Sequence, residues 1–311
     1  MRIALAQLAP VLLNRDATLA RVHDAIDAAA ADGARWVVFG ESLVPGYPIW
    51  LSRTGGAAFD DPLQKALHAR YLEQGVVVTE HLSGVQERAA QHGIGVILGI
   101  AERARDRAGH TLYCSAVTVL PDGRIGSVHR KLMPTHEERL CWGIGDGNGL
   151  VVHRDRGFVI GTLNCWENWM PLARVALQSQ GETLHVAIWP GGARNTAMLT
   201  PMLAREGRSF AISVGGLYRP EDIAPLSLPG KTALLAGTPL DYDGGSCAAG
   251  PDGRWLLPPQ QGVEGIFTVE LDPALVRAER QNFDPSGHYS RPDVFSLTVD
   301  RQRQGLVTFQ D

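Results

Sequence analysis

The sequence predicts an α/β fold, in which residues 1–281 form one layered domain and residues 282–311 form a C-terminal tail. Two observations carry this prediction. Short apolar, β-branched runs alternate along the chain with segments of helical periodicity, which is the pattern of strands and helices packed in layers. In addition, 44% of the 311 residues are hydrophobic, which is enough material for one large core.

The N-terminal third begins with a strand, a helix and a second strand. Residues 2–8 are apolar enough for a buried strand, and Asp16 can cap a helix that ends at Gly33. The short run 36–39 predicts another buried strand, so Glu41 lies at its carboxyl end. Proline and glycine then break regular structure before two further helices. These helices are expected around 62–73 and 79–92.

The middle of the chain contains a predicted hairpin followed by a long loop. Strands are expected at 94–101 and 112–120, and a Pro-Asp-Gly turn leads the second of them into a strand at 124–129. Lys131 lies just beyond that strand. The segment 132–149 is irregular and rich in glycine, and a loop of this length inside a compact domain is usually functional.

The second half of the chain returns to alternating strands and helices. A strand at 158–163 runs directly toward Cys165, and Pro171 suits the first turn of a helix. The tail 282–311 is polar and is expected to wrap over a neighbouring subunit or to be partly mobile. The other expected elements are strands at 151–152, 183–189, 212–217, 245–249, 254–257 and 263–270 and helices at 195–210 and 273–282.

Charge, hydropathy and cysteine content exclude several classes of protein. The net charge is -4 and no block of one sign stands out, which argues against nucleic acid and anionic membrane as partners. The N-terminus lacks the features of a signal peptide and no apolar run approaches the length of a membrane span, so a soluble cytoplasmic protein is expected. Four cysteines without a Cys-x-x-Cys pair are too sparse for a disulfide scaffold. They are Cys114, Cys141, Cys165 and Cys247.

Three reactive side chains share one kind of location. Glu41, Lys131 and Cys165 each follow a predicted strand, and the carboxyl ends of strands in open α/β sheets converge on one edge where sites are built. A cation and a following helix N-terminus both lower the pKa of a thiol, while a carboxylate can accept its proton. The sequence therefore predicts Cys165 as a nucleophile. Cys114 and Cys141 are expected to be packing residues, although Cys141 could border the site.

Three segments resemble the signature blocks of the nitrilase superfamily, in order and in separation. They are FGESLVPGYP at 39–48, HRKLMPTHEER at 129–139 and NCWENWMPL at 164–172, and a late GHYSRPD stretch at 287–293 fits as well. Any one block alone is moderate evidence, whereas three in register are strong. The Cys-Trp-Glu and Pro-Thr-His-x-Glu-Arg runs are similar to the nitrilase branch rather than to the amidase or carbamoylase branches.

The resemblance implies a four-layer αββα sandwich that pairs through one helical face into a homodimer or a longer spiral homo-oligomer. It also implies a cofactor-free and metal-free nitrilase that converts an organic nitrile to the carboxylic acid and ammonia. Glu41 is then the general base, Cys165 forms a thioimidate and later a thioester, and Lys131 with a backbone N–H near Trp166 stabilises the developing negative charge. Glu138 resembles the supporting glutamate of the family. The expected substrate-binding residues are Tyr47, Trp166, Trp189 and His288.

Four other interpretations remain open at this point. An amidase or a nitrile or cyanide hydratase would use the same triad, and a non-catalytic interaction subunit would keep the fold. A thiol redox protein lacks a resolving cysteine near Cys165. A metal site is the fourth, although its spacing matches no zinc pattern. Its ligands would come from His129, His136, Glu137, Glu138 and Cys141.

Overall fold

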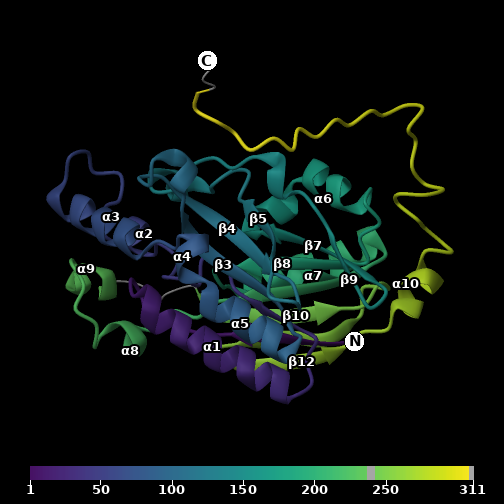
Figure 1. Cartoon of the computed structure of the whole chain (residues 1–311), viewed down its shortest axis with the longest axis horizontal. Helices are drawn as coiled ribbons and strands as arrows, with labels where there is room; N and C mark the ends of the chain where they lie inside the picture. The colour runs from purple at the N-terminus through teal and green to yellow at the C-terminus, as the bar shows by residue number, and fades with distance from the viewer. Residues whose placement is uncertain (237–241, 308–311) are drawn as a thin grey trace.

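The computed structural model describes residues 1–236 and 242–307, and its centre is a pair of six-stranded mixed sheets (Figure 1). In the first sheet the strands lie in the order β12-β1-β2-β3-β4-β5, with β1, β2 and β3 parallel. The bounds are β1 (Arg2–Gln7), β2 (Trp36–Phe39), β3 (Gly95–Arg103), β4 (Leu112–Val119), β5 (Ile125–Arg130) and β12 (Gly265–Glu270).

The second sheet repeats this plan, in the order β11-β10-β9-β8-β7-β6. Its central strands β7, β8 and β9 are parallel, and antiparallel strands flank them on both sides. The bounds are β6 (His153–Asp155), β7 (Phe158–Asn164), β8 (Leu184–Trp189), β9 (Phe210–Gly215), β10 (Gly244–Ala249) and β11 (Trp255–Gln261).

Helices cover the outer faces of both sheets (Figure 1). On the first sheet these are α1 (Arg15–Ala31) and α5 (Ser83–His92), and on the second they are α6 (Pro171–Gln178) and α7 (Ala193–Gly207). The remaining elements are α2 (Trp50–Arg53), α3 (Pro62–Gln74), α4 (Val78–His81), α8 (Pro220–Ile223), α9 (Lys231–Leu235), α10 (Pro273–Glu279) and the 3₁₀ helices η1 (Arg105–Arg107), η2 (His136–Leu140), η3 (Gly147–Gly149) and η4 (Cys165–Trp169). Within the described ranges, no helix is long and apolar enough to cross a membrane.

The side-chain alternation along β2 shows how the layers are held together. Trp36 and Val38 point into the core between the two sheets, where they pack with residues such as Ile188. Val37 and Phe39 point the other way, into the cluster formed with α1 and α5. A strand with both faces apolar must be covered on both sides. The four-layer αββα sandwich that the sequence resemblance implied is therefore confirmed.

Two local predictions were wrong in detail, and one short helix was missed. The helix expected over 79–92 is divided into α4 and α5, because the fully buried Leu82 turns the chain between them with a ψ of 8°. The strand expected at 151–152 is instead β6, two residues later, where the chain pairs with β7. The helix α2 was not predicted at all.

The tail returns over its own chain after α10 (Figure 1). Ser286 Oγ donates to the carbonyl of Gln178 at 2.8 Å, and the Arg303 guanidinium reaches Asp146 at 2.9 Å. Between these anchors the tail exposes apolar side chains, of which Phe295 is 76% accessible. Residues 308–311 lie outside the described residues. A place for the tail at a subunit interface stays a prediction.

Candidate active site

The residues that follow β2, β5 and β7 meet where the carboxyl ends of the strands adjoin. The strands β2 and β5 run in the same direction because two antiparallel pairings separate β3 from β5. The backbone N–H of Glu41 donates to the carbonyl of Trp189 at 2.9 Å, which joins the end of β2 to the end of β8 in the other sheet. Glu41, Lys131 and Cys165 are thereby brought to one place, as the sequence predicted.

A glycine on β3 makes this approach possible. A Cβ atom on Gly99 would lie 2.1 Å from the carbonyl oxygen of Gly40 and 2.6 Å from the amide nitrogen of Ser42. No side chain fits at such distances, so the segment that carries Glu41 can cross β3 only over a glycine.

Lys131 is buried between two carboxylates. Its Nζ lies 2.8 Å from Glu41 Oε1 and 2.7 Å from Glu138 Oε2, and all three side chains are almost completely inaccessible. Burial alone lowers the pKa of the Lys131 ammonium, but the carboxylates of Glu41 and Glu138 and the thiol of Cys165 outweigh this and hold it well above its usual value. Lys131 is therefore a permanent cation at the centre of the site.

Two donors besides Lys131 hold the carboxylate of Glu138 in place. The hydroxyl of Tyr47 donates to its Oε1 at 2.8 Å, and the backbone N–H of Thr135 donates to its Oε2 at 2.6 Å. The second bond belongs to a capping box, in which the Thr135 side chain in turn accepts from the backbone of η2. Glu138 thus holds the ammonium of Lys131 in position.

Glu41 keeps one oxygen free. Its Oε1 accepts from Lys131 and from the Cys114 thiol, whose Sγ lies 3.2 Å away, while the buried Oε2 has no hydrogen-bond partner. Burial raises the pKa of the Glu41 carboxyl, Lys131 lowers it and Glu138 raises it again, which leaves it at about 7. A carboxylate with this pKa and a free oxygen is suited to accept a proton near neutral pH.

Cys165 stands on a sharp turn at the end of β7. Its φ of 45° lies in the left-handed region, and the following residues form η4 before α6 begins at Pro171. An oxygen of Glu41, an oxygen of Glu138 and the Cys165 sulfur all lie within 4.8 Å of one another. The thiol was expected to have a lowered pKa, and this was wrong: burial raises the pKa well above its usual value, although Lys131 lowers it.

A buried contact between Glu167 and His129 ties the turn of Cys165 to the strand that precedes Lys131. Both oxygens of Glu167 contact His129 Nε2, at 3.1 and 3.0 Å. The same carboxylate accepts the backbone N–H groups of Asn164 at 2.8 Å and Leu132 at 2.5 Å. Burial raises the pKa of Glu167, but His129 and these bonds more than compensate and hold it below the usual value. One side chain therefore organises the backbone on both sides of the site.

A second buried chain of hydrogen bonds supports Cys165 from behind. Asn168 Nδ2 donates to the carbonyl of Cys165 at 2.7 Å, and Asn168 Oδ1 contacts His185 Nε2 at 2.7 Å. His185 Nδ1 lies 3.0 Å from Glu182. These contacts hold the strained backbone of the turn in place.

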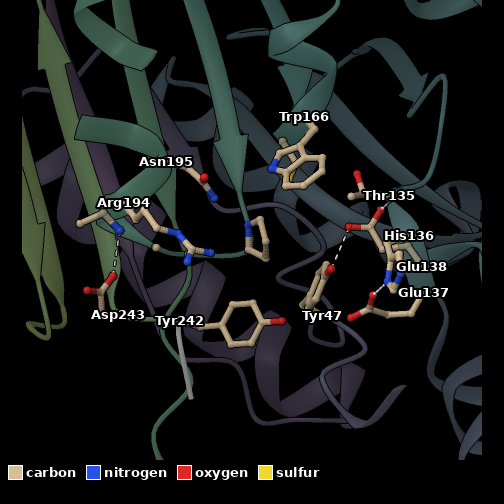
Figure 2. A pocket seen from close by; sticks show the side chains of 15 residues that line it. Tyr47, Thr135, His136, Glu137, Glu138, Trp166, Arg194, Asn195, Tyr242 and Asp243 are labelled. Carbon is tan, nitrogen blue, oxygen red and sulfur yellow. Dashed lines mark hydrogen bonds and ion pairs between the residues drawn. The ribbon is translucent and has the colours of Figure 1, made fainter. Parts of the chain in front are cut away.

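A cavity of about 500 Å³ opens onto the sulfur of Cys165. Figure 2 shows Tyr47, Glu138 and Trp166 on one wall and Arg194, Asn195 and Tyr242 on the other. Its volume and its mixture of apolar and polar walls are typical of small-molecule sites.

Two of the four expected substrate-binding residues line this cavity and two do not. Tyr47 and Trp166 border it. Trp189 is instead fully buried, with its Nε1 donating to Ser213 Oγ at 3.1 Å, because the indole points into the core on that side of β8. His288 lies exposed in the tail, where its ring contacts Tyr289, because the chain leaves the domain after α10.

Sequence reasoning missed several residues that contact the site. Cys114 was expected only to pack, yet it donates to Glu41, because its position on β4 faces the end of β2. Glu167 could have been found from the Asn-x-x-Glu spacing of a capping box at 164–167. Arg194 and Asn195 line the cavity from the start of α7, and no local sequence pattern predicted that they would.

The residues of the alternative metal site are not brought together. His129 contacts Glu167, His136 pairs with Glu137, and Glu138 faces Lys131. Within the described chain, the one set with suitable ligand atoms in reach of each other is Glu41, Glu138 and Cys165. The Lys131 ammonium contacts both of those carboxylates and already supplies the positive charge between them.

Comparison with known proteins agrees with this geometry. The family model of carbon–nitrogen hydrolases matches residues 2–281. The chain is 33% identical to a nitrilase from an unknown prokaryotic organism over 99% of this chain and 95% of that protein. It is 35% identical to an aliphatic nitrilase of Sinorhizobium fredii, with 98% and 97% covered, and 32% identical to an arylacetonitrilase of Macrophomina phaseolina, with 100% and 94% covered.

Among solved structures, the fold is similar to that of an amidase of the nitrilase superfamily from Nesterenkonia. The TM-score is 0.67 with 20% sequence identity, over 91% of this chain and 95% of the amidase. At this identity the likeness concerns the fold alone. The family match over nearly the whole domain, together with full-length relatives at about one third identity, leads to one conclusion: the chain belongs to the carbon–nitrogen hydrolases, enzymes that act on carbon–nitrogen bonds other than peptide bonds.

Proposed function

We propose that the protein is a nitrilase, which converts an organic nitrile and two molecules of water to a carboxylic acid and ammonia. The observation that carries the proposal is the buried cluster of Glu41, Lys131 and Cys165. A Glu41 oxygen lies within 4.8 Å of the Cys165 sulfur, Glu41 Oε1 lies 2.8 Å from the Lys131 ammonium, and Cys165 lines the cavity. Nitrilases among the full-length relatives support this substrate class over an amide.

Each step can be assigned to a group that lies in reach. Glu41 Oε2 takes the proton of the Cys165 thiol while the sulfur forms a bond to the nitrile carbon. The carbon–nitrogen triple bond becomes a double bond, and Glu41 returns the proton to the nitrogen, which gives a neutral thioimidate. A water molecule then adds to the carbon and ammonia leaves, which gives a thioester. A second water displaces the sulfur, and the carboxylic acid is released.

The raised pKa of the Cys165 thiol fits this order of events. A thiol that remains protonated at neutral pH needs a base at the moment of attack, and Glu41, with a pKa of about 7, supplies it. Lys131 cannot act as that base because it stays charged. In this mechanism its ammonium and the backbone N–H of Trp166 stabilise negative charge on the substrate nitrogen, and Glu138 positions the ammonium.

The proposal is tested by ammonia release from a panel of aliphatic, aryl and arylacetic nitriles and the corresponding amides. We expect release from at least one nitrile with the carboxylic acid as the accompanying product. Release from amides with no response to any nitrile would identify an amidase with the same triad. Formation of an amide as the sole product would indicate that only one water is added.

The thiol of Cys114 leads to a prediction about pH dependence. In Cys114→Ala the Glu41 carboxylate loses a donor, so its pKa should rise further and it should stay protonated to a higher pH. The acidic limb of kcat/KM, expected near pH 7 in the unchanged enzyme, should therefore move upward by about 0.5 to 1 pH unit. Cys114→Ser keeps a donor and should restore the original limb. An acidic limb that is the same in all three proteins contradicts the role of Cys114.

We also propose that residues 1–281 act as one domain and that the chain forms a homodimer or a longer spiral. The support is an exposed apolar face on η4 and α6, on which Trp169, Leu172 and Val175 are 41%, 64% and 44% accessible. An uncovered apolar face next to a site commonly marks an interface. The tail 282–311, which exposes Phe295, is proposed to lie at a subunit contact as well.

Light scattering coupled to size-exclusion chromatography tests the assembly. The unchanged protein should elute as a dimer or larger, and Leu172→Asp should shift it toward the monomer, because a carboxylate would be buried in the interface. Phe59→Asp is the matched control, since Phe59 is equally apolar and fully exposed but lies far from this face in the sequence, before α3. A protein that is monomeric at all concentrations refutes the assembly.

A further inference from the structure

Arg194 and Asn195 lie at the start of α7, on the cavity wall that faces the turn of Cys165 (Figure 2). They follow a loop in which two positions require glycine. Gly191 and Gly192 have φ values of 142° and 104°, and a Cβ on Gly191 would lie 2.6 Å from the carbonyl oxygen of Gly216. The loop therefore fixes where α7 begins, and with it the direction in which Arg194 and Asn195 project.

The carboxylates around the cavity already have their own partners. Asp243 accepts the backbone N–H of Ala193 at 2.9 Å through Oδ1 and the Gln261 side chain at 3.3 Å through Oδ2. Glu137 pairs with His136. Neither of these two acids is left in need of a cation among the residues that the structure describes.

Glu138, the third acid on the wall, is satisfied as well. It binds Lys131 at 2.7 Å and the Tyr47 hydroxyl at 2.8 Å. The positive charge of Arg194 is therefore not required by any of the three.

Arg194 is the charged side chain on the cavity wall that has no partner among the described residues. Within the described part of the chain its guanidinium makes no hydrogen bond and no ion pair, and the Asn195 side chain next to it makes no hydrogen bond either. Figure 2 shows both side chains extending from α7 toward the space between the two walls. A guanidinium offers a planar fork of donors that matches a carboxylate, and an amide can add a further donor beside it.

We propose that Arg194 and Asn195 bind a carboxylate, or a comparable anionic group, at the end of the substrate remote from the nitrile. This inference builds on the proposed nitrilase function, to which it adds the substrate class: aliphatic or arylaliphatic nitriles that carry an acid. The nitrile carbon is then attacked at Cys165 on one wall while the acid is held on the other, in a cavity of about 500 Å³ that has room for both.

A matched set of substrates tests this directly. The set contains a short aliphatic nitrile that ends in a carboxylate, the same nitrile ending in an alcohol, and the same nitrile ending in an amine. We expect the enzyme to prefer the acid. Arg194→Gln should raise KM for the acid about tenfold or more, because the lost hydrogen bonds to a charged group contribute at least that factor to binding. The same change should alter kcat/KM for the alcohol less than about twofold.

Two variants serve as controls. Arg194→Lys keeps the charge but loses the planar fork, so it should recover part of the preference for the acid. Arg205→Gln removes an exposed arginine from the same helix, and Arg205 does not line the cavity, so all three substrates should behave as with the unchanged enzyme. A preference for the amine or the alcohol in the unchanged enzyme, or an equal effect of Arg194→Gln on all three substrates, overturns the proposal.

A binding measurement separates this proposal from the proposed function. Calorimetric titration of Cys165→Ala with the acid-bearing nitrile reports binding without turnover, and adding Arg194→Gln should weaken that binding by the same factor of about ten. If the enzyme hydrolyses none of the nitriles but this binding difference is present, the nitrilase function fails and the anion site stands. If turnover of nitriles is observed but the binding difference is absent, the anion site fails alone.

Discussion

Replacing Cys165 by alanine is expected to abolish hydrolysis, with a loss in kcat on the order of 10⁴-fold or more. The cause is chemical rather than structural. Without the sulfur no thioimidate or thioester can form, and water held near Glu41 is a much weaker nucleophile than the thiol. Because the side chain is small and lies at the floor of a cavity, the fold should survive the change.

The measurement has two parts. Steady-state ammonia release gives the loss of turnover, and rapid quenching followed by mass spectrometry should capture an acyl adduct on Cys165 in the unchanged enzyme. Cys247→Ala is the matched control, because Cys247 is an equally buried thiol that donates to Thr200 at 3.3 Å and does not line the cavity. That control should keep the activity and the adduct. Retention of turnover by Cys165→Ala would remove the thiol mechanism.

The members of the triad could be predicted because each of them follows a strand that the sequence identifies clearly. The runs before Glu41 and Cys165 are short, apolar and β-branched, and such runs become central parallel strands. Here they are central strands of two different sheets, and their carboxyl ends adjoin where the two sheets pack together. The location of Lys131 came from the hairpin turn before β5. The local sequence around each residue was therefore enough to place all three directly after strands.

The cavity walls could not be predicted in the same way. Arg194 reaches the cavity because β8 and α7 are joined by a glycine turn that packs against Gly216, which follows β9. Cys114 reaches Glu41 because of the register between β3 and β4. Contacts of this kind are set by pairing between distant segments. Trp189 is the opposite case, a residue predicted to line the cavity that does not. It is an aromatic residue at the end of a strand, but its side chain faces the core.

The charges of the site explain why its parts depend on each other. Burial disfavours every ion in it, so each charge persists only beside an opposite one. Lys131 remains protonated because of Glu41 and Glu138, and Glu41 titrates near neutrality because burial and Glu138 oppose the effect of Lys131. Changing one member of the site should therefore alter the protonation of the others.

Glu167→Gln is expected to lower both stability and turnover, although Glu167 touches no substrate. The carboxylate is the shared acceptor for His129 and for the backbone N–H groups of Leu132 and Asn164. A glutamine has one acceptor oxygen, and its amide group would face donors. Leaving a buried donor without its acceptor typically costs about 1–3 kcal/mol for each donor. The residues next to Lys131 and Cys165 would lose their common anchor, so kcat should fall with little change in KM.

Urea unfolding at neutral pH measures the free energy of unfolding, and its dependence on pH gives a more specific signature. The folded-state pKa of Glu167 lies below its usual value of 4.5, so its contribution to stability is complete above 4.5 and is lost as the pH falls through the lower folded-state value. In Glu167→Gln this part of the acid-induced loss should be missing. Glu279→Gln is the control, because Glu279 forms a partly exposed ion pair with Arg208 at 2.9 Å and should cost less than about 1 kcal/mol. Equal stability of Glu167→Gln and the unchanged protein, with the same acid-induced loss, would mean that this carboxylate does not organise the two catalytic turns.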